Sequence, residues 1–255
     1  MLDLRLIGIG AGAPDHVTRQ GEAAIRSADL ILLPRKGDDK SDLAELRLQI
    51  IAAACDAAPA ACAAAAPTIA EFDMPVRDPA LPYLQRVERW HDAIAERWTQ
   101  ALAAHPGARS AALLVWGDPS LYDSTLRIAA RLRPAPRLTV VPGITALQAL
   151  TAAHAVPLNT VGDAVVVTTG RRLRDQGWPE GARSLAVMLD GACAFQTLPA
   201  ERFDIWWGAN LGLPSQVLRA GPLADLAQEI PRLREAARAG HGWIMDVYLL
   251  RLRDG

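Results

Sequence analysis

The sequence predicts an α/β protein of two domains, the first built on a mostly parallel sheet and the second on a mixed sheet. Three observations support this fold class. The 255 residues suffice for one or two domains of about 150 residues each. Short apolar runs alternate with helical patterns through the first half of the chain. After Pro142-Gly143 the apolar runs become more closely spaced.

The first domain is expected to span residues 1–143. Apolar runs typical of buried strands cover 4–10, 29–34, 110–116 and 138–141, and helical patterns cover 17–27, 41–54, 81–104 and 120–132. In the helix 81–104, Leu84, Val87, Ile94 and Trp98 recur at helical spacing. Alternation of strands and helices predicts a parallel sheet with helices on both faces.

The second domain is expected to span residues 144–255, because Pro-Gly after a strand is a strong chain-turning signal. Its apolar runs cover 164–169, 184–189, 203–209, 217–220 and 243–252. The helical pieces between these runs are shorter than those of the first half. The spacing therefore predicts a mixed or partly antiparallel sheet.

The composition is that of a folded protein in a reducing compartment. Apolar residues make up 51% and charged residues 22%, which excludes a disordered chain. A net charge of −1 excludes a nucleic-acid binder held by bulk charge. The alanine-rich region 50–67 is too short and too interrupted to span a membrane, and its second half is expected to be a surface connection. No targeting segment is visible, and three cysteines without metal-ligand spacing are interpreted as free thiols, so we expect a cytoplasmic protein.

Glycine-rich turns follow three of the predicted strands. The first, Gly8 to Ala13, satisfies the dinucleotide pattern G-x-G-x-x-A, but Pro14 and Asp15 follow it at once. The second begins at Trp116-Gly117-Asp118, and the third is Pro142-Gly143. Because parallel strands end at one edge of a sheet, where ligands of open α/β folds bind, we expect the three turns to line one pocket.

These motifs together resemble a known family, the tetrapyrrole (cobalamin/sirohaem) methyltransferases. The resemblance rests on the Gly-x-Gly-x-Gly turn followed by Asp15 and Thr18, on Gly117-Asp118-Pro119, and on the run 140–145, and it covers the whole chain. Ala11 and Ala13 stand where many relatives have Pro and Gly. The segments 36–43, 122–127 and 207–216 resemble the members that act on precorrin-5.

The resemblance implies a cleft between the two domains that holds S-adenosylmethionine, without a metal. The residues implied to contact this cofactor are Trp116, Gly117, Asp118, Leu121, Thr145, Ala146, Met188, Asn210 and Leu211. The implied reaction is methylation of precorrin-5 at C-1 with loss of acetate, giving precorrin-6A and S-adenosylhomocysteine. A homodimer is left open, and no nucleic-acid or membrane partner is expected.

Loss of acetate requires a base that activates water and a donor for the oxyanion. Asp15 is the first candidate for the base, with Asp123 behind it and Tyr122 on the same turn. Asp118 is expected to fix its own turn or the cofactor. The histidines lack the spacing of metal ligands.

The substrate carries many carboxylates, so basic residues near the strand ends are candidate clamps. The residues expected to face the substrate are Gly10, Gly12, Arg35, Lys36, Lys40, Arg171 and Arg172. Lys36 and Lys40 are the only lysines of the chain and share one loop with Arg35. Arg171 and Arg172 are expected in a second basic loop, after the strand that ends at Thr169.

Three alternatives stay open at this stage. The first is another tetrapyrrole methyltransferase of the same family. The second is an NADP-dependent reductase that uses the first glycine turn and holds the 2′-phosphate with Arg35. The third is a non-catalytic module that senses a nucleotide.

Overall fold

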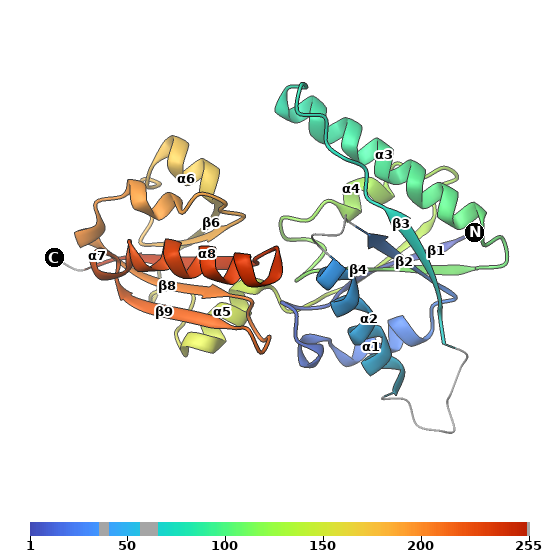
Figure 1. Cartoon of the computed structure of the whole chain (residues 1–255), viewed down its shortest axis with the longest axis horizontal. Coiled ribbons are helices and arrows are strands. Elements are labelled where there is room, and N and C mark those ends of the chain that lie inside the picture. The colour runs from blue at the N-terminus through green and yellow to red at the C-terminus, as the bar shows by residue number, and fades with distance from the viewer. Residues whose placement is uncertain (36–40, 57–65, 254–255) are drawn as a thin grey trace. The chain divides into compact units, whose positions relative to one another are not determined.

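The computed structural model describes residues 1–35, 41–56 and 66–253 of the chain. The chain divides into two compact units, Met1–Thr145 and Ala146–Gly255. Each unit is an α/β domain with its own sheet (Figure 1).

The first unit contains a five-stranded parallel sheet with strand order β3-β2-β4-β1-β5. Its strands are β1 (Asp3–Gly8), β2 (Leu30–Arg35), β3 (Thr68–Asp73), β4 (Ser110–Val115) and β5 (Arg137–Val141). Its helices are η1 (Pro14–His16), α1 (Arg19–Arg26), α2 (Ser41–Asp56), α3 (Tyr83–Ala103) and α4 (Thr125–Ala129). The central strand β4 is buried along its whole length.

Helices cover both faces of this sheet, as the strand–helix alternation predicts. One core cluster joins the sheet to α3 and α4 through Ile94, Trp98 and Ile128. The other cluster joins the opposite face to α1 and α2 through Ile25 and Ile50. In Figure 1, α1 and α2 lie together on one side of the strands, and α3 and α4 lie on the other.

The second unit contains a mixed sheet with strand order β6-β7-β10-β8-β9. Its strands are β6 (Val165–Thr169), β7 (Ser184–Met188), β8 (Phe203–Ala209), β9 (Val217–Pro222) and β10 (Asp246–Leu252). Its helices are α5 (Ala146–His154), α6 (Gly170–Gln176), η4 (Ala194–Thr197), η5 (Ala200–Arg202), α7 (Leu223–Leu226) and α8 (Glu229–His241). Strands β6 and β7 are parallel, whereas β10 runs antiparallel to both β7 and β8. The predicted fold class, parallel first and mixed second, is confirmed.

Three local predictions differ from the structure. Strand β3 was missed, because its alternating burial leaves Ile69 exposed and gives only a short apolar signal. The helix expected over 120–132 is limited to α4, since the residues before Thr125 form turns. The basic segment 171–174 lies in helix α6 rather than in a loop, because Thr169 caps this helix by accepting a hydrogen bond from the Arg172 N–H.

Candidate active site

The three glycine turns meet at the carboxyl edge of the first sheet. Strand β1 lies between β4 and β5, so Gly8, Val115 and Val141 end side by side. Gly117 donates a backbone hydrogen bond of 2.8 Å to Gly10. The turns approach so closely that a Cβ on Gly143 would lie 2.1 Å from the Gly117 carbonyl oxygen. Glycine is therefore required where the turns touch.

The Asp118 carboxylate ties two of these turns together. One oxygen accepts hydrogen bonds from the N–H and the hydroxyl of Ser120, and the other accepts the Gly143 N–H at 2.9 Å. Partial burial pushes the pKa of Asp118 upward, but the hydrogen bonds from Ser120 and Gly143 outweigh it and hold the pKa below its ordinary value. Asp118 is therefore an ionised clamp inside the turn cluster.

The first glycine turn leads into a short 3-10 helix rather than directly into α1. Gly10 and Gly12 have φ angles of 77° and 138°, which favour glycine. Gly10 packs on His16, and α1 begins only at Arg19, behind its Thr18 cap. A dinucleotide fingerprint needs the turn to open a helix. The local geometry therefore does not support the NADP alternative.

The candidate bases are in different environments. Asp15 is exposed, and no hydrogen bond to its carboxylate is found within the described part of the chain. Asp123 accepts hydrogen bonds from the N–H and the hydroxyl of Thr125, the first residue of α4. Tyr122 is exposed at φ 50°, and Leu121 closes the turn by donating to the Asp118 carbonyl. Of the two candidate carboxylates, only that of Asp15 is free of hydrogen bonds within the described residues.

Arg35 is already engaged by two acids. Its guanidinium lies 2.5 Å from Glu71 and 3.7 Å from Glu45. A 2′-phosphate or a substrate carboxylate would compete with both carboxylates for this cation. Lys36 and Lys40, the other members of the predicted clamp, lie outside the described residues.

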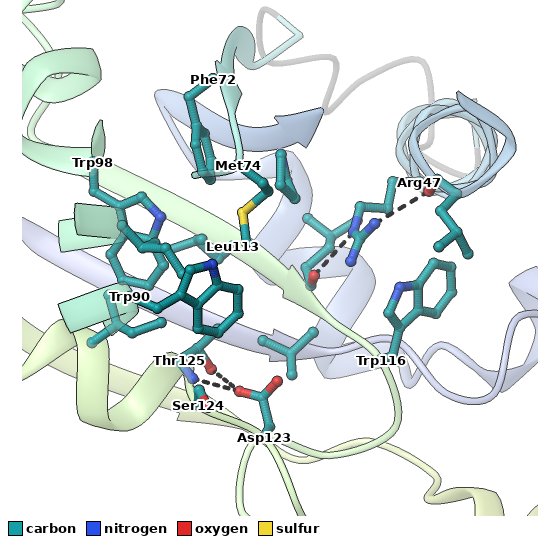
Figure 2. A pocket seen from close by; sticks show the side chains of 16 residues that line it. Arg47, Phe72, Met74, Trp90, Trp98, Leu113, Trp116, Asp123, Ser124 and Thr125 are labelled. Carbon is teal, nitrogen blue, oxygen red and sulfur yellow. Dashed lines mark hydrogen bonds between the residues drawn. The ribbon is translucent and has the colours of Figure 1, made fainter. Parts of the chain in front are cut away.

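A cavity of about 220 Å³ lies beside the turn cluster in the first unit (Figure 2). Its walls are mostly apolar and include Trp90, Trp98 and Trp116, and its charged lining residues are Arg47 and Asp123.

Sequence reasoning missed Arg47. The available signal was its position on the apolar face of the helix, four residues after Leu43 and three before Ile50.

In the second unit the predicted cofactor residues lie at the ends of parallel strands. Strands β7 and β8 both run antiparallel to β10, so Met188 and the residues after Ala209 reach the same edge of the sheet. Asn210 is fully buried at φ 52°, and its backbone N–H donates to the Met245 carbonyl. Leu211 is also buried, whereas Leu189 beside Met188 is 66% exposed.

The remaining predicted residues lie at the unit boundary or on the surface. Thr145 ends the first unit, and Ala146 is the first residue of α5. Arg172 donates to the Gln176 side chain one helical turn away. Arg171 also lies on α6, so the two arginines are presented by a helix.

Among the described residues, no group of three or more side chains is arranged to hold a metal ion. Over the same residues, no helix has the length and hydropathy that crossing a membrane requires.

Comparison with known proteins places the chain in a family. The family model described as tetrapyrrole (corrin/porphyrin) methylases matches residues 3–227. The chain belongs to the tetrapyrrole methylases. It is 42% identical to a precorrin-6A synthase [deacetylating] from Sinorhizobium sp, over 98% of this chain and 95% of that protein. The predicted family and its methyltransferase activity are thereby confirmed.

Solved structures of tetrapyrrole methylases and related proteins share the fold. The crystal structure of a cobalamin synthesis related protein (CobF) from Corynebacterium diphtheriae covers 100% of both chains, with 37% identity and a TM-score of 0.81. A uroporphyrin-III C-methyltransferase from Thermus thermophilus, crystallised with S-adenosylhomocysteine, covers 98% of this chain and 92% of its own, with 17% identity and a TM-score of 0.57. The second likeness supports the fold alone.

Proposed function

We propose that this tetrapyrrole methylase transfers a methyl group from S-adenosylmethionine to C-1 of precorrin-5 and releases acetate. The products are precorrin-6A and S-adenosylhomocysteine. The observation that carries the proposal is the 42% identity to the Sinorhizobium precorrin-6A synthase over nearly the whole chain. The turn cluster around Asp118 supports it, because the motifs that suggested the family form one continuous structure at a sheet edge.

Strand-end residues of each unit are the proposed contacts of S-adenosylmethionine, whose methyl transfer requires no metal. The proposed contacts are Trp116, Gly117, Asp118, Leu121 and Thr145 in the first unit, with Ala146, Met188, Asn210 and Leu211 in the second unit. Asp118 would act through the turns, since its three hydrogen bonds hold Ser120 of its own turn and the Gly143 backbone of the third turn. When bound, this cofactor supplies an electrophilic methyl group on a sulfonium. The protein's contribution is then mainly to hold donor and acceptor in line.

Acetate release needs water as a second reactant. The bond between the ring carbon and the acetyl carbon breaks, the water oxygen joins the acetyl carbonyl, and the electron pair returns to the ring system. One proton of the water must be removed. Asp15 is the proposed acceptor of this proton, because its exposed carboxylate makes no hydrogen bond within the described residues. Asp123 would lose its cap on Thr125 if it took this role.

Two measurements test the proposal. Calorimetric titration with S-adenosylhomocysteine, beside NADPH, should show one binding site per chain for the former alone. Incubation with precorrin-5 and S-adenosylmethionine should then release acetate, seen by NMR, together with S-adenosylhomocysteine. Methyl transfer without acetate would assign the chain to another reaction of the family. Binding of NADPH alone would contradict the methyltransferase site altogether.

A further inference from the structure

The cavity of the first unit combines apolar walls with one half-buried cation, Arg47. It lies where the ends of β2, β3 and β4 meet helices α2, α3 and α4. Figure 2 shows Trp90 and Trp98 on one side and Arg47 with Trp116 on the other, with Asp123 below. Phe72 and Met74 complete the apolar wall. The volume of about 220 Å³ admits a small organic group.

Arg47 is held in place but keeps a hydrogen-bonding edge unused. Its Nε donates to the Leu114 carbonyl at 3.3 Å, and one terminal nitrogen donates to the Leu43 carbonyl at 3.2 Å. Its guanidinium carbon lies 4.7 Å from the centre of the Trp116 ring. The second terminal nitrogen has no hydrogen-bond partner among the described residues. A guanidinium fixed in this way is preorganised to bind an anion.

The charge of Arg47 is not neutralised by an ion pair within the described part of the chain. Asp123 is the acid whose charge acts on it, but the two groups form no salt bridge, and one Asp123 oxygen is used by Thr125. Burial lowers the pKa of Arg47 to about 10, against the smaller opposing effect of Asp123. Arg47 therefore remains charged at neutral pH. A partly desolvated cation without an ion-pair partner is stabilised when an anion binds it.

Trp98 supplies an independent observation in the same cavity. Its side chain is 1% exposed, and its Nε1 has no hydrogen-bond partner among the described residues. The neighbouring Trp90, by contrast, donates to the Pro75 carbonyl at 2.8 Å. Buried polar groups are nearly always hydrogen-bonded, so an unpaired indole N–H in a cavity indicates a missing acceptor. The cavity thus offers two unused donors, on Arg47 and Trp98, between apolar walls.

We propose that this cavity binds the carboxylate of an aliphatic acid, with Arg47 as its charged partner. Apolar walls suit the methyl or methylene part of such an acid, and the donors suit its oxygens. The inference rests on the proposed function, which provides two sources of this chemistry. One source is a carboxylate side chain of the tetrapyrrole, and the other is the free acetate that the reaction releases.

The test compares Arg47→Met with Arg97→Met, a matched change at an exposed arginine of α3. Methionine keeps the apolar stem and removes the charge, a change that buried sites often tolerate. Binding of [1-13C]acetate is followed by NMR, and binding of uroporphyrin III, a stable octacarboxylate tetrapyrrole, by tryptophan fluorescence. Titration with S-adenosylhomocysteine and a melting curve on each variant report the cofactor site and the fold.

Arg47→Met should weaken binding of at least one of the two probes about tenfold or more, because a charge-assisted hydrogen bond is lost. Weakened acetate binding assigns the cavity to the released acid, and weakened uroporphyrin binding alone assigns it to a substrate side chain. Trp98→Phe keeps an aromatic side chain but removes the indole N–H, so it should weaken binding of the same probe. This variant provides a second test if Arg47→Met does not fold.

Unchanged affinity for both probes in Arg47→Met or Trp98→Phe would overturn the inference. Wild-type affinity for S-adenosylhomocysteine in these variants would then leave the proposed function intact. Failure of the wild-type protein to bind S-adenosylhomocysteine would instead reject the proposed function, whatever the cavity binds.

Discussion

Replacement of Gly143 by alanine should push the three turns apart. The added Cβ would lie 2.1 Å from the Gly117 carbonyl oxygen and 2.7 Å from two backbone atoms of Gly8, whereas ordinary contacts begin at 3.4 Å. These neighbours are backbone atoms, so no side chain can rotate away. Overpacking of a core costs about 1–3 kcal/mol. Because only backbone can yield here, we expect a loss near the top of that range, about 3 kcal/mol.

The matched control is Gly107→Ala. A Cβ at Gly107 would meet nothing within 4 Å. Its backbone lies outside the left-handed region. Alanine at such a position changes the free energy of unfolding by no more than about 1 kcal/mol, because it lowers the conformational entropy of the unfolded chain.

Urea unfolding measures the loss, and hydrogen exchange should locate it. In Gly143→Ala, the amides at the ends of β1, β4 and β5 should exchange faster than in the control, and S-adenosylhomocysteine should bind more weakly. Equal stability of the two variants, with unchanged exchange at these strand ends, would refute the argument that backbone contact requires glycine at the turns.

Three further predictions concern single carboxylates. Asp118→Ala removes the acceptor of the Gly143 N–H, so the free energy of unfolding should fall by about 2 kcal/mol. Calorimetry should also show weaker binding of S-adenosylhomocysteine, and unchanged affinity would remove Asp118 from the cofactor site. Asp15→Asn should slow acetate release, followed by NMR, with cofactor binding intact, and wild-type turnover would eliminate Asp15 as the base. Hydrogen bonds from the Ser110 and Arg109 N–H groups and the Ser110 hydroxyl lower the pKa of Asp29 in the folded protein. The ionised Asp29 should therefore contribute its full stabilisation of the fold above the pKa of an unfolded aspartate, about 3.9. This contribution should disappear as the pH falls through the lower pKa of the folded state. Urea unfolding of Asp29→Asn should therefore differ from wild type at pH 7 and converge with it in acid, and a difference independent of pH would contradict this assignment.

Local sequence patterns were sufficient for most of the elements but not for their edges. The long helix α3 follows from its apolar spacing, and β4 from an unbroken apolar run that a central parallel strand requires. Strand β3 could not be predicted from the apolar pattern, because an edge strand with one covered face has few apolar residues. The basic residues Arg171 and Arg172 favour a loop in the sequence, but Thr169 caps the helix α6 that contains them.

Some features of the candidate site could be predicted from the sequence, and others depend on the tertiary structure. The meeting of the turns at Gly8, Gly117 and Gly143 could be predicted, because the carboxyl ends of parallel strands share one edge. The hydrogen bond from Gly143 to Asp118 could not, since it joins residues from different turns. The pairing of Arg35 with Glu71 likewise depends on which strands are neighbours.

The sequence by itself determined the family, the alternation that yields a parallel and a mixed sheet, and the glycine turns, because these depend on residue order and on short-range backbone preferences. Only the tertiary structure decided which charges are solvated and which are buried. Arg47 and Arg97 are both helical arginines in the sequence, yet packing against Trp116 places one in a cavity and leaves the other exposed. Desolvation is a property of the surrounding chain, brought together from distant segments, and it makes one arginine a candidate binding group and the other a surface residue.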